Sequence, residues 1–217
     1  MVRTPKRGGS DEHDGKVEEA EGAWIELPGL GKPGALEKRN FPPGQHGRTV
    51  VKKKLTQYAV QLHEKQKLLF HYGLREEQLR RFVRTAQSKS SSNWIDTLVS
   101  LLERRVDNIV FRLGFARSMA AARQLVSHGH VLVDDRILTI GSALVKPGSS
   151  VRLTEYAGGA MTEASRLSPR LPLPSFLRFA SEGINTHGLV LLTPGLEHVP
   201  FAFDARQVAE YYAKRGV

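Results

Sequence analysis

The chain has 217 residues, of which 40% are apolar and 25% charged, proportions that are ordinary for a globular protein of one or two domains and argue against wholesale disorder. It carries 32 Lys and Arg against 22 Asp and Glu, a formal net charge of +10, which favours a cytosolic protein with a polyanionic partner. The lack of cysteine excludes disulfides and thiolate chemistry, and no apolar run is long enough to span a bilayer.

The charge is unevenly distributed along the chain. Between residues 11 and 26, seven acidic residues and one Lys give a net charge of −6, and we expect residues 1–23 to form a mobile tail. Residues 38–89 carry thirteen Lys or Arg and three Glu, a net charge of +10. Such a run is often only a solvated face, but a surplus this concentrated favours binding to a polyanion.

The first half of the chain is predicted to be helical after a long loop. Residues 27–47 are rich in Pro and Gly and are predicted to be loop. Helices are expected over 55–71 and 75–87, followed by a Ser-rich linker at 88–93. The apolar stripe of the first helix is expected to be Leu55, Tyr58, Ala59, Leu62 and Leu69.

A third helix is predicted from Asn93, which can cap it, to Leu113, because apolar residues recur along it at steps of three and four. A shorter helix is expected between Ser118 and His128, with Gly129 in the left-handed conformation after its end.

Strands are predicted in the second half. Residues 131–133 and 136–140 are expected to pair across a tight turn at Asp134-Asp135, and 150–154 to follow. After a Gly- and Pro-rich connector, further strands are expected at 189–192 and 201–203. Asp204 is expected to cap a final helix.

No catalytic or metal motif is complete. A Walker loop, a dinucleotide-binding glycine motif and a nucleophile elbow are all absent. His128 and His130 flank one glycine, but the lack of further ligands nearby disfavours a metal site. Asp134 and Asp135 are adjacent on a turn, which disfavours an acid–base pair. We therefore expect no enzyme, no metal, no cofactor and no small-molecule substrate.

Five arginines lie on or between the two helices that meet at Gly114. A guanidinium group can make two hydrogen bonds to one phosphate, so this unit is suited to gripping RNA by its backbone and shape. For Arg104 and Arg105 the alternative is ion pairing with Glu103 and Asp107. The five are Arg104, Arg105, Arg112, Arg117 and Arg123.

The same region resembles a known family. Residues 104–116 read RRVDNIVFRLGFA and residues 122–133 read ARQLVSHGHVLV, and both are similar to the bacterial ribosomal protein S4 family. The segment PPGQHG at 42–47, Tyr58 and EKQK at 64–67 also match it. The clear similarity runs from about 38 to 153 and continues more loosely into the closing helix.

The resemblance implies an α+β fold. A helical rRNA-binding domain would comprise 38–92 together with 196–217, so that the C-terminal helix returns to it. An S4-type RNA-binding domain, two short helices packed on a small sheet, would occupy 93–195 with its core at 104–154. Residues 1–37 would be an acidic tail and loop.

The resemblance also implies a function. The protein would be a structural constituent of the small ribosomal subunit in the cytoplasm, would bind small-subunit rRNA directly and would nucleate subunit assembly. It would contact neighbouring small-subunit proteins and mRNA on its path into the ribosome, with an effect on translational accuracy. No membrane partner is implied.

Candidate RNA-binding residues come from two sources. The resemblance carries over Arg39, Gln45, His46, Arg48, Lys65, Gln66, Lys67, Arg104, Arg112, Arg123, Gln124, His128 and His130. The basic surplus adds Lys52, Lys53, Lys54, Arg80, Arg81, Arg84, Arg105 and Arg117.

The chain also departs from the family pattern. The N-terminal cysteines found in many members are missing and an acidic segment takes their place. His63, Leu69, Phe70 and Met119 stand where the family usually has cations. A divergent, cysteine-free paralogue that binds RNA off the ribosome, as a regulator or stress factor, is the alternative. An enzyme with this module as an appendage is disfavoured, because such appendages usually lack the preceding loop and helices.

Overall fold

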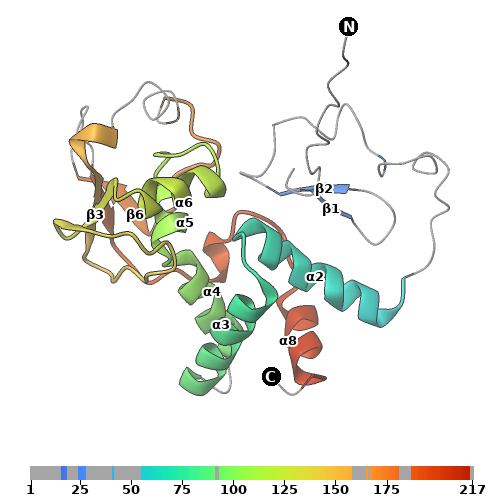
Figure 1. Ribbon diagram of the computed structural model, residues 1–217. Coiled ribbons are helices and arrows are strands. Elements are labelled where there is room, and N and C mark those ends of the chain that lie inside the picture. Colours follow the sequence, from blue (N-terminus) through green and yellow to red (C-terminus); the bar gives the residue numbers. More distant parts are fainter. Residues whose placement is uncertain are drawn as a thin grey trace, which may run out of the picture.

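The computed structural model describes residues 16–18, 24–27, 41, 55–90, 93–157, 165, 167–180 and 187–215. Within these residues, the fold consists of helices and a five-stranded antiparallel sheet (Figure 1). Their buried apolar side chains form two separate hydrophobic cores. The α+β class expected from the sequence is confirmed.

Two short strands lie in the acidic N-terminal segment. β1 (Lys16–Glu18) pairs antiparallel with β2 (Trp24–Glu26), with Val17 opposite Ile25. No strand was predicted in residues 1–23, and the mobility of this segment stays a prediction. An apolar residue between two charged ones is itself a strand pattern, which the acidic composition of the segment obscured.

The first long helix buries only part of the predicted stripe, since Leu62 and Leu69 pack against a hydrophobic core. α2 (Gln57–His71) begins at Thr56, whose Oγ1 accepts a hydrogen bond from the backbone N–H of Ala59. Tyr58, expected in the apolar stripe, is 49% exposed, whereas Gln61 is buried. Gln61 Nε2 donates to Glu210 Oε2 at 2.8 Å. Polar pairing with the C-terminal helix thus fixes the orientation of α2, because a buried amide needs a partner.

The next two helices complete the first core. α3 (Glu76–Lys89) buries Leu79, Val83 and Ala86 at helical spacing, close to the predicted bounds. α4 (Trp94–Glu103) packs against α3. Both contribute apolar side chains to the same hydrophobic cluster as α2.

The third predicted helix is in fact two helices. α4 ends at Glu103, and α5 (Val106–Arg112) begins after Arg105, whose backbone is extended at φ −63° and ψ 138°. Around this break, the N–H of Val106 donates to Ala143 O and the N–H of Val145 donates to Arg104 O, both at 2.9 Å. These bonds replace the intrahelical ones. The apolar stripe is buried on both sides of the break, so the periodicity identified the core face correctly.

The predicted short helix follows the turn after α5. α6 (Met119–Ser127) starts at Ser118, whose Oγ accepts from the N–H of Ala121 at 3.2 Å. Gly129 follows with φ +75°, the left-handed conformation that was predicted. α6 packs against α5.

The sheet follows α6. β3 (Val131–Val133) pairs with β4 (Arg136–Ile137) across the predicted turn, and with β5 (Ser150–Leu153) on its other side. Asp134 and Asp135 have φ values of 49° and 65°, as a two-residue hairpin turn with both central residues left-handed requires. The hairpin prediction is confirmed.

Two more strands extend the sheet, in the order β4-β3-β5-β7-β6. β7 (Gly188–Val190) lies close to the predicted 189–192. β6 (Leu177–Phe179) pairs with β7 and was not predicted. Short 3₁₀ helices, η3 (Glu155–Ala157) and η4 (Leu196–His198), stand in the connections.

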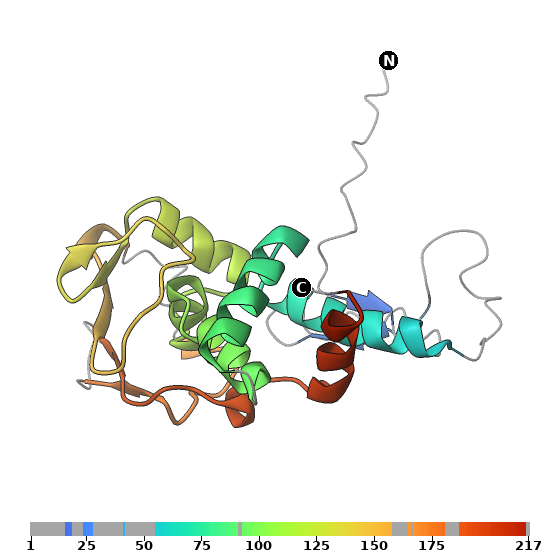
Figure 2. The same cartoon turned by 90° about the horizontal axis from the view of Figure 1, so that it is seen from below.

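The C-terminal helix returns to the helical core. The residues predicted as a strand at 201–203 are not one; Phe201 and Phe203 instead pack against that core. α8 (Ala205–Ala213) starts at Asp204, whose Oδ1 accepts from the N–H of Arg206 at 2.9 Å. α8 lies beside α2 in both views (Figures 1 and 2).

The two cores divide the chain later than predicted. Leu98 and Leu102 of α4 share a cluster with Tyr212 of α8, while Val106 and Ile109 of α5 belong to the cluster that includes the sheet. We therefore place the division between α4 and α5 rather than at residue 93.

Candidate nucleic-acid interface

The junction between α5 and α6 is held in a tight turn. Gly114 has φ +74°, and a Cβ there would lie 3.2 Å from Pro169 Cβ. Phe115, immediately after it, is 1% exposed and belongs to the second core. The turn therefore fixes the position on the surface of Arg117, two residues after Phe115.

Four of the predicted RNA-binding residues come together beside α6. A pocket of about 270 Å³ is lined by Arg117 from the turn, Gln124 and His128 from α6, and His130 from the residue before β3. The rings of the two histidines lie 6.2 Å apart between centroids. Gln124 and Arg117 are exposed. The structure thus gathers these four side chains on one surface.

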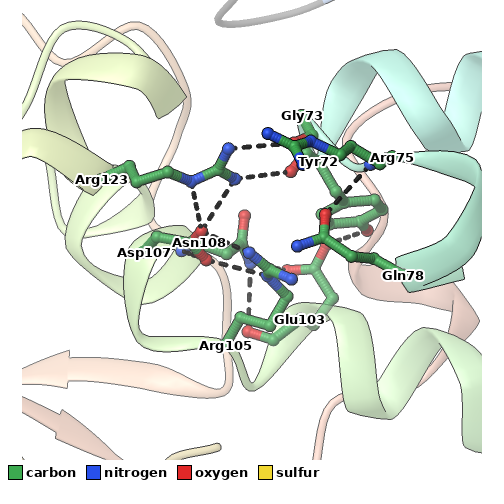
Figure 3. A network of polar contacts seen from close by, with 9 residues as sticks. All are labelled: Tyr72, Gly73, Arg75, Gln78, Glu103, Arg105, Asp107, Asn108 and Arg123. Atoms are coloured by element: carbon green, nitrogen blue, oxygen red, sulfur yellow. Dashed lines mark hydrogen bonds and ion pairs between the residues drawn. The ribbon is translucent and has the colours of Figure 1, made fainter. Parts of the chain in front are cut away.

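Two other predicted arginines bind groups of the protein itself (Figure 3), although the Arg123 side chain is still 41% exposed. Arg105 is 2% exposed and binds Asp107 through Nε at 2.9 Å and Nη2 at 2.5 Å. Arg123 binds the same carboxylate through Nη2 at 3.0 Å and donates to the carbonyls of Gly73 and Tyr72. The expectation that Arg105 faces RNA is not supported, because Arg105 forms the ion pair considered as the alternative. Arg123 donates its hydrogen bonds to Asp107 and to the backbone at the end of α2.

A buried carboxylate lies next to this network. Glu103 has no solvent exposure; its Oε1 accepts from Tyr72 Oη at 2.5 Å and its Oε2 from Asn108 Nδ2 at 2.8 Å. Burial raises the pKa of Glu103, and the charge of Arg112 and the two hydrogen bonds oppose that shift. Burial and the neighbouring carboxylate also raise the pKa of Tyr72, so the phenol keeps the proton that it donates.

The remaining arginines of α4 and α5 also point inward. Arg112 is 5% exposed and its Nη2 donates to the carbonyl of His198 at 2.9 Å. Arg104 is half-buried and its Nε donates to Val145 O at 2.8 Å. The chain before α8 therefore covers most of Arg112, which does not favour the expected contact with RNA; that contact stays a prediction.

In the helical core, three predicted cations are paired with carboxylates. Lys65 is 7% exposed and its Nζ lies 2.5 Å from Glu76 Oε2. Lys67 binds Glu64 at 2.7 Å. Arg80 reaches the other oxygen of Glu76 at 3.3 Å. All three cations thus have a carboxylate partner, which the buried charges of Lys65 and Lys67 require.

The same helices also carry predicted residues that remain accessible. Arg81 and Arg84 are exposed on α3, three residues apart and so on one helix face, and Gln66 is half-buried on α2. The predicted residues of the N-terminal loop lie outside the described part of the chain. They are Arg39, Gln45, His46, Arg48, Lys52, Lys53 and Lys54.

Sequence reasoning missed several exposed cations on the sheet. Arg136 lies on β4, Lys146 lies in the turn before β5, and Arg178 lies on β6. Arg152 is also exposed but binds Asp135 at 2.7 Å. The exposure of Lys146 could have been predicted from the sequence, because Lys146 precedes a Pro-Gly turn and residues that flank such turns face solvent.

Ser175 and His198 superficially resemble a catalytic pair. Ser175 Oγ lies 3.0 Å from His198 Nε2. The other ring nitrogen, Nδ1, lies 3.0 Å from both the backbone N–H of Gly195 and Glu197 Oε1. We assign Nδ1 as the acceptor of the backbone N–H, because the Glu197 side chain is 72% exposed and is free to turn into water. The proton is then on Nε2, so the imidazole cannot take one from Ser175 as a general base must.

The described residues contain neither a metal-binding cluster nor a helix that could cross a membrane. No group of three or more His, Cys, Asp or Glu side chains is arranged there to hold a metal ion. None of the described helices combines the length and the hydrophobicity that crossing a bilayer requires.

Comparison with known proteins divides the chain where the structure does. A family described as "Ribosomal protein S4/S9 N-terminal domain" matches residues 16–103, and one described as "S4 domain" matches residues 104–151. The boundary between them falls at the break between α4 and α5.

Several curated proteins are similar over most of their length. "Small ribosomal subunit protein uS4B" of Bdellovibrio bacteriovorus is 51% identical over 192 residues, which cover 88% of this chain and 91% of that protein. "Small ribosomal subunit protein uS4" of Methylobacillus flagellatus is 43% identical over 192 residues, covering 88% and 92%. A uS4B protein of Nitrosomonas europaea is 40% identical over 193 residues, with the same coverage.

Proposed function

The chain belongs to the ribosomal protein S4 family, and from this premise we propose that it is a non-catalytic structural constituent of the small ribosomal subunit that binds small-subunit rRNA directly. The similarity to proteins of that name spans both cores, so the proposal applies to the whole described chain. The single observation that carries it is this match across both units.

The electrostatics support RNA as the partner. The accessible cations with no acidic partner among the described residues include Arg81 and Arg84 on α3, Arg117 beside α6, and Lys146 near β5. Phosphate contacts from such side chains release counterions and provide most of the affinity of a protein for RNA. The proposed binding surface is therefore smaller than the one expected from the sequence, since Arg105 and Arg112 are withdrawn from it.

The finer roles extend this proposal. We infer that the protein acts in cytoplasmic ribosomes, joins the small subunit early in its assembly, and contacts neighbouring ribosomal proteins and mRNA on its path into the ribosome. Arg123 of α6 binds Asp107 of α5 and the backbone at the end of α2, and so holds the two cores together. This supports an early role, because a binder whose units are already fixed loses less entropy on contact with folded RNA.

The test is sedimentation of the chain in its own cells. A tagged copy, expressed at native level during exponential growth, is followed across a sucrose gradient. We expect it in small-subunit particles and in complete ribosomes, and to stay there after a wash at moderate salt. Recovery only at the top of the gradient would contradict the proposal.

The alternative of a paralogue acting off the ribosome rests on the replaced cations. Met119 is 2% exposed and lies in the second core, and Leu69 packs against the first. At these two positions the side chain contributes to packing, so the replacements do not by themselves remove a surface charge. Recovery of the tagged chain with non-ribosomal RNA would favour this alternative.

A further inference from the structure

The pocket beside α6 is built from one face of that helix. Ala121, Gln124, Leu125 and His128 are spaced by three and four residues and therefore lie along one side of it. The turn before the helix supplies Phe115 as a further wall. The helix and the turn are both anchored in the second core, so the pocket is preformed.

Its lining is apolar inside and polar at the rim. Phe115, Ala121 and Leu125 provide apolar contact, while Arg117 and Gln124 carry hydrogen-bonding groups that are accessible. None of the described residues that line it is acidic. An apolar interior with a few convergent polar groups is typical of a site for a small planar ligand.

The volume of the pocket limits the kind of ligand that it can hold. At about 270 Å³ it is slightly smaller than most small-molecule pockets, which measure about 300–1,000 Å³. It cannot admit a helix of RNA, but it can admit one aromatic heterocycle. Sequence-specific contacts to RNA are usually made to bases that have left the stack and lie against aromatic or guanidinium groups.

We propose that this pocket receives one unstacked base of the bound RNA. The base lies against the apolar wall and the imidazoles of His128 and His130, the amide of Gln124 hydrogen-bonds its edge, and Arg117 holds the adjoining phosphate. An amide has both a donor and an acceptor and so can pair with a base edge. This inference rests on the proposed rRNA binding and adds a base-specific contact to it.

Two substitutions on α6 test the pocket with a matched control. Ala121→Phe fills it, and Ala120→Phe places the same ring on the adjacent, exposed position, which does not line the pocket. Gln124→Leu keeps the size of the side chain but removes its hydrogen-bonding groups. The full-length proteins are bound at saturating concentration to small-subunit rRNA, whose base edges are probed with dimethyl sulfate, kethoxal and carbodiimide.

We expect the wild type and Ala120→Phe to protect at least one unpaired base that Ala121→Phe and Gln124→Leu leave reactive. Affinity for the rRNA should fall roughly ten-fold in the two pocket variants, the order expected for one lost stacked base. Identical protection by all four proteins would overturn the pocket proposal while leaving rRNA binding intact. If Ala121→Phe fails to fold, Gln124→Leu decides alone. If the wild type does not bind small-subunit rRNA at all, the proposed function fails first.

Discussion

Arg123 and Asp107 connect three elements from both cores: Arg123 Nη2 lies 3.0 Å from Asp107 Oδ2, while Arg123 Nη1 donates to Gly73 O at 2.9 Å (Figure 3). α6 is thereby tied both to α5 and to the end of α2. Arg105 binds the same carboxylate, which has no solvent exposure. Two guanidinium groups therefore depend on one buried acid.

We expect Asp107→Asn to destabilise the protein by about 3–5 kcal/mol, because it leaves a buried guanidinium without its counter-charge. Urea denaturation, with the free energy of unfolding extrapolated to water, measures the effect. The matched control is Asp135→Asn, which removes the acidic partner of Arg152 at a side chain that is 77% exposed and should cost less than about 1 kcal/mol. Equal losses in the two variants would show that the network around Asp107 is not a structural clamp.

The hydrogen bond from Tyr72 to Glu103 should give stability a characteristic pH dependence. Burial raises the pKa of Glu103 above its usual 4.5, so its stabilising contribution is present below that pH and is lost as the pH rises through the folded-state pKa. The phenol opposes this loss because it stabilises the ionised carboxylate. We therefore expect Tyr72→Phe to cost about 0.5–1.5 kcal/mol when Glu103 is neutral and about 1.5–3 kcal/mol when it is ionised.

The free energies of unfolding of the wild type and Tyr72→Phe, measured from about pH 4 to about pH 9, check this expectation. Tyr156→Phe is the control, since Tyr156 is 94% exposed and should give no pH-dependent difference. A penalty for Tyr72→Phe that shrinks as the pH rises would contradict the assignment of the phenol as donor to a carboxylate.

Arg112→Ala should lower the stability of the fold rather than remove a direct contact with RNA. Its guanidinium is buried, holds the carbonyl of His198 and offsets the charge of Glu103, so we expect a loss of about 2–4 kcal/mol. Arg81→Ala, the same change on an exposed helix face, should alter stability by less than about 0.5 kcal/mol. The result that would count against the structure is a fully stable Arg112→Ala protein with impaired RNA binding.

The sequence predicted helices, most caps and the hairpin well where the signal is local, although Asn93 stands at the N-cap of α4 without a side-chain capping hydrogen bond. Ser118, Asp204 and Gly129 occupy the predicted capping positions because capping depends on neighbouring backbone groups. The break at Arg105 could not be seen, since it depends on hydrogen bonds with the loop around Ala143, far along the chain. The burial of Gln61 on α2 was missed for a related reason, because Glu210, the partner of its side chain, lies far along the chain.

The site was predicted only in part. The pattern placed Gln124 and His128 one turn apart on α6 and beside His130, and the structure gathers them around one pocket. It could not distinguish an arginine that faces solvent from one that faces a buried acid. Arg105 and Arg117 are equally basic in the sequence, yet of the two only Arg105 has an aspartate within reach among the described residues.

The salt dependence of rRNA binding tests the central claim most directly, namely that exposed, unneutralised cations bind the RNA backbone. Filter binding of the full-length chain to small-subunit rRNA is measured across a salt series for the wild type, Arg117→Ala and Arg206→Ala. Arg206 is the control because it is exposed but paired with Glu210 at 3.1 Å. We predict that Arg117→Ala lowers the slope of log K against log salt by about 0.7–0.9, while Arg206→Ala leaves it unchanged. An unchanged slope for Arg117→Ala, or wild-type binding that does not respond to salt, would contradict the account.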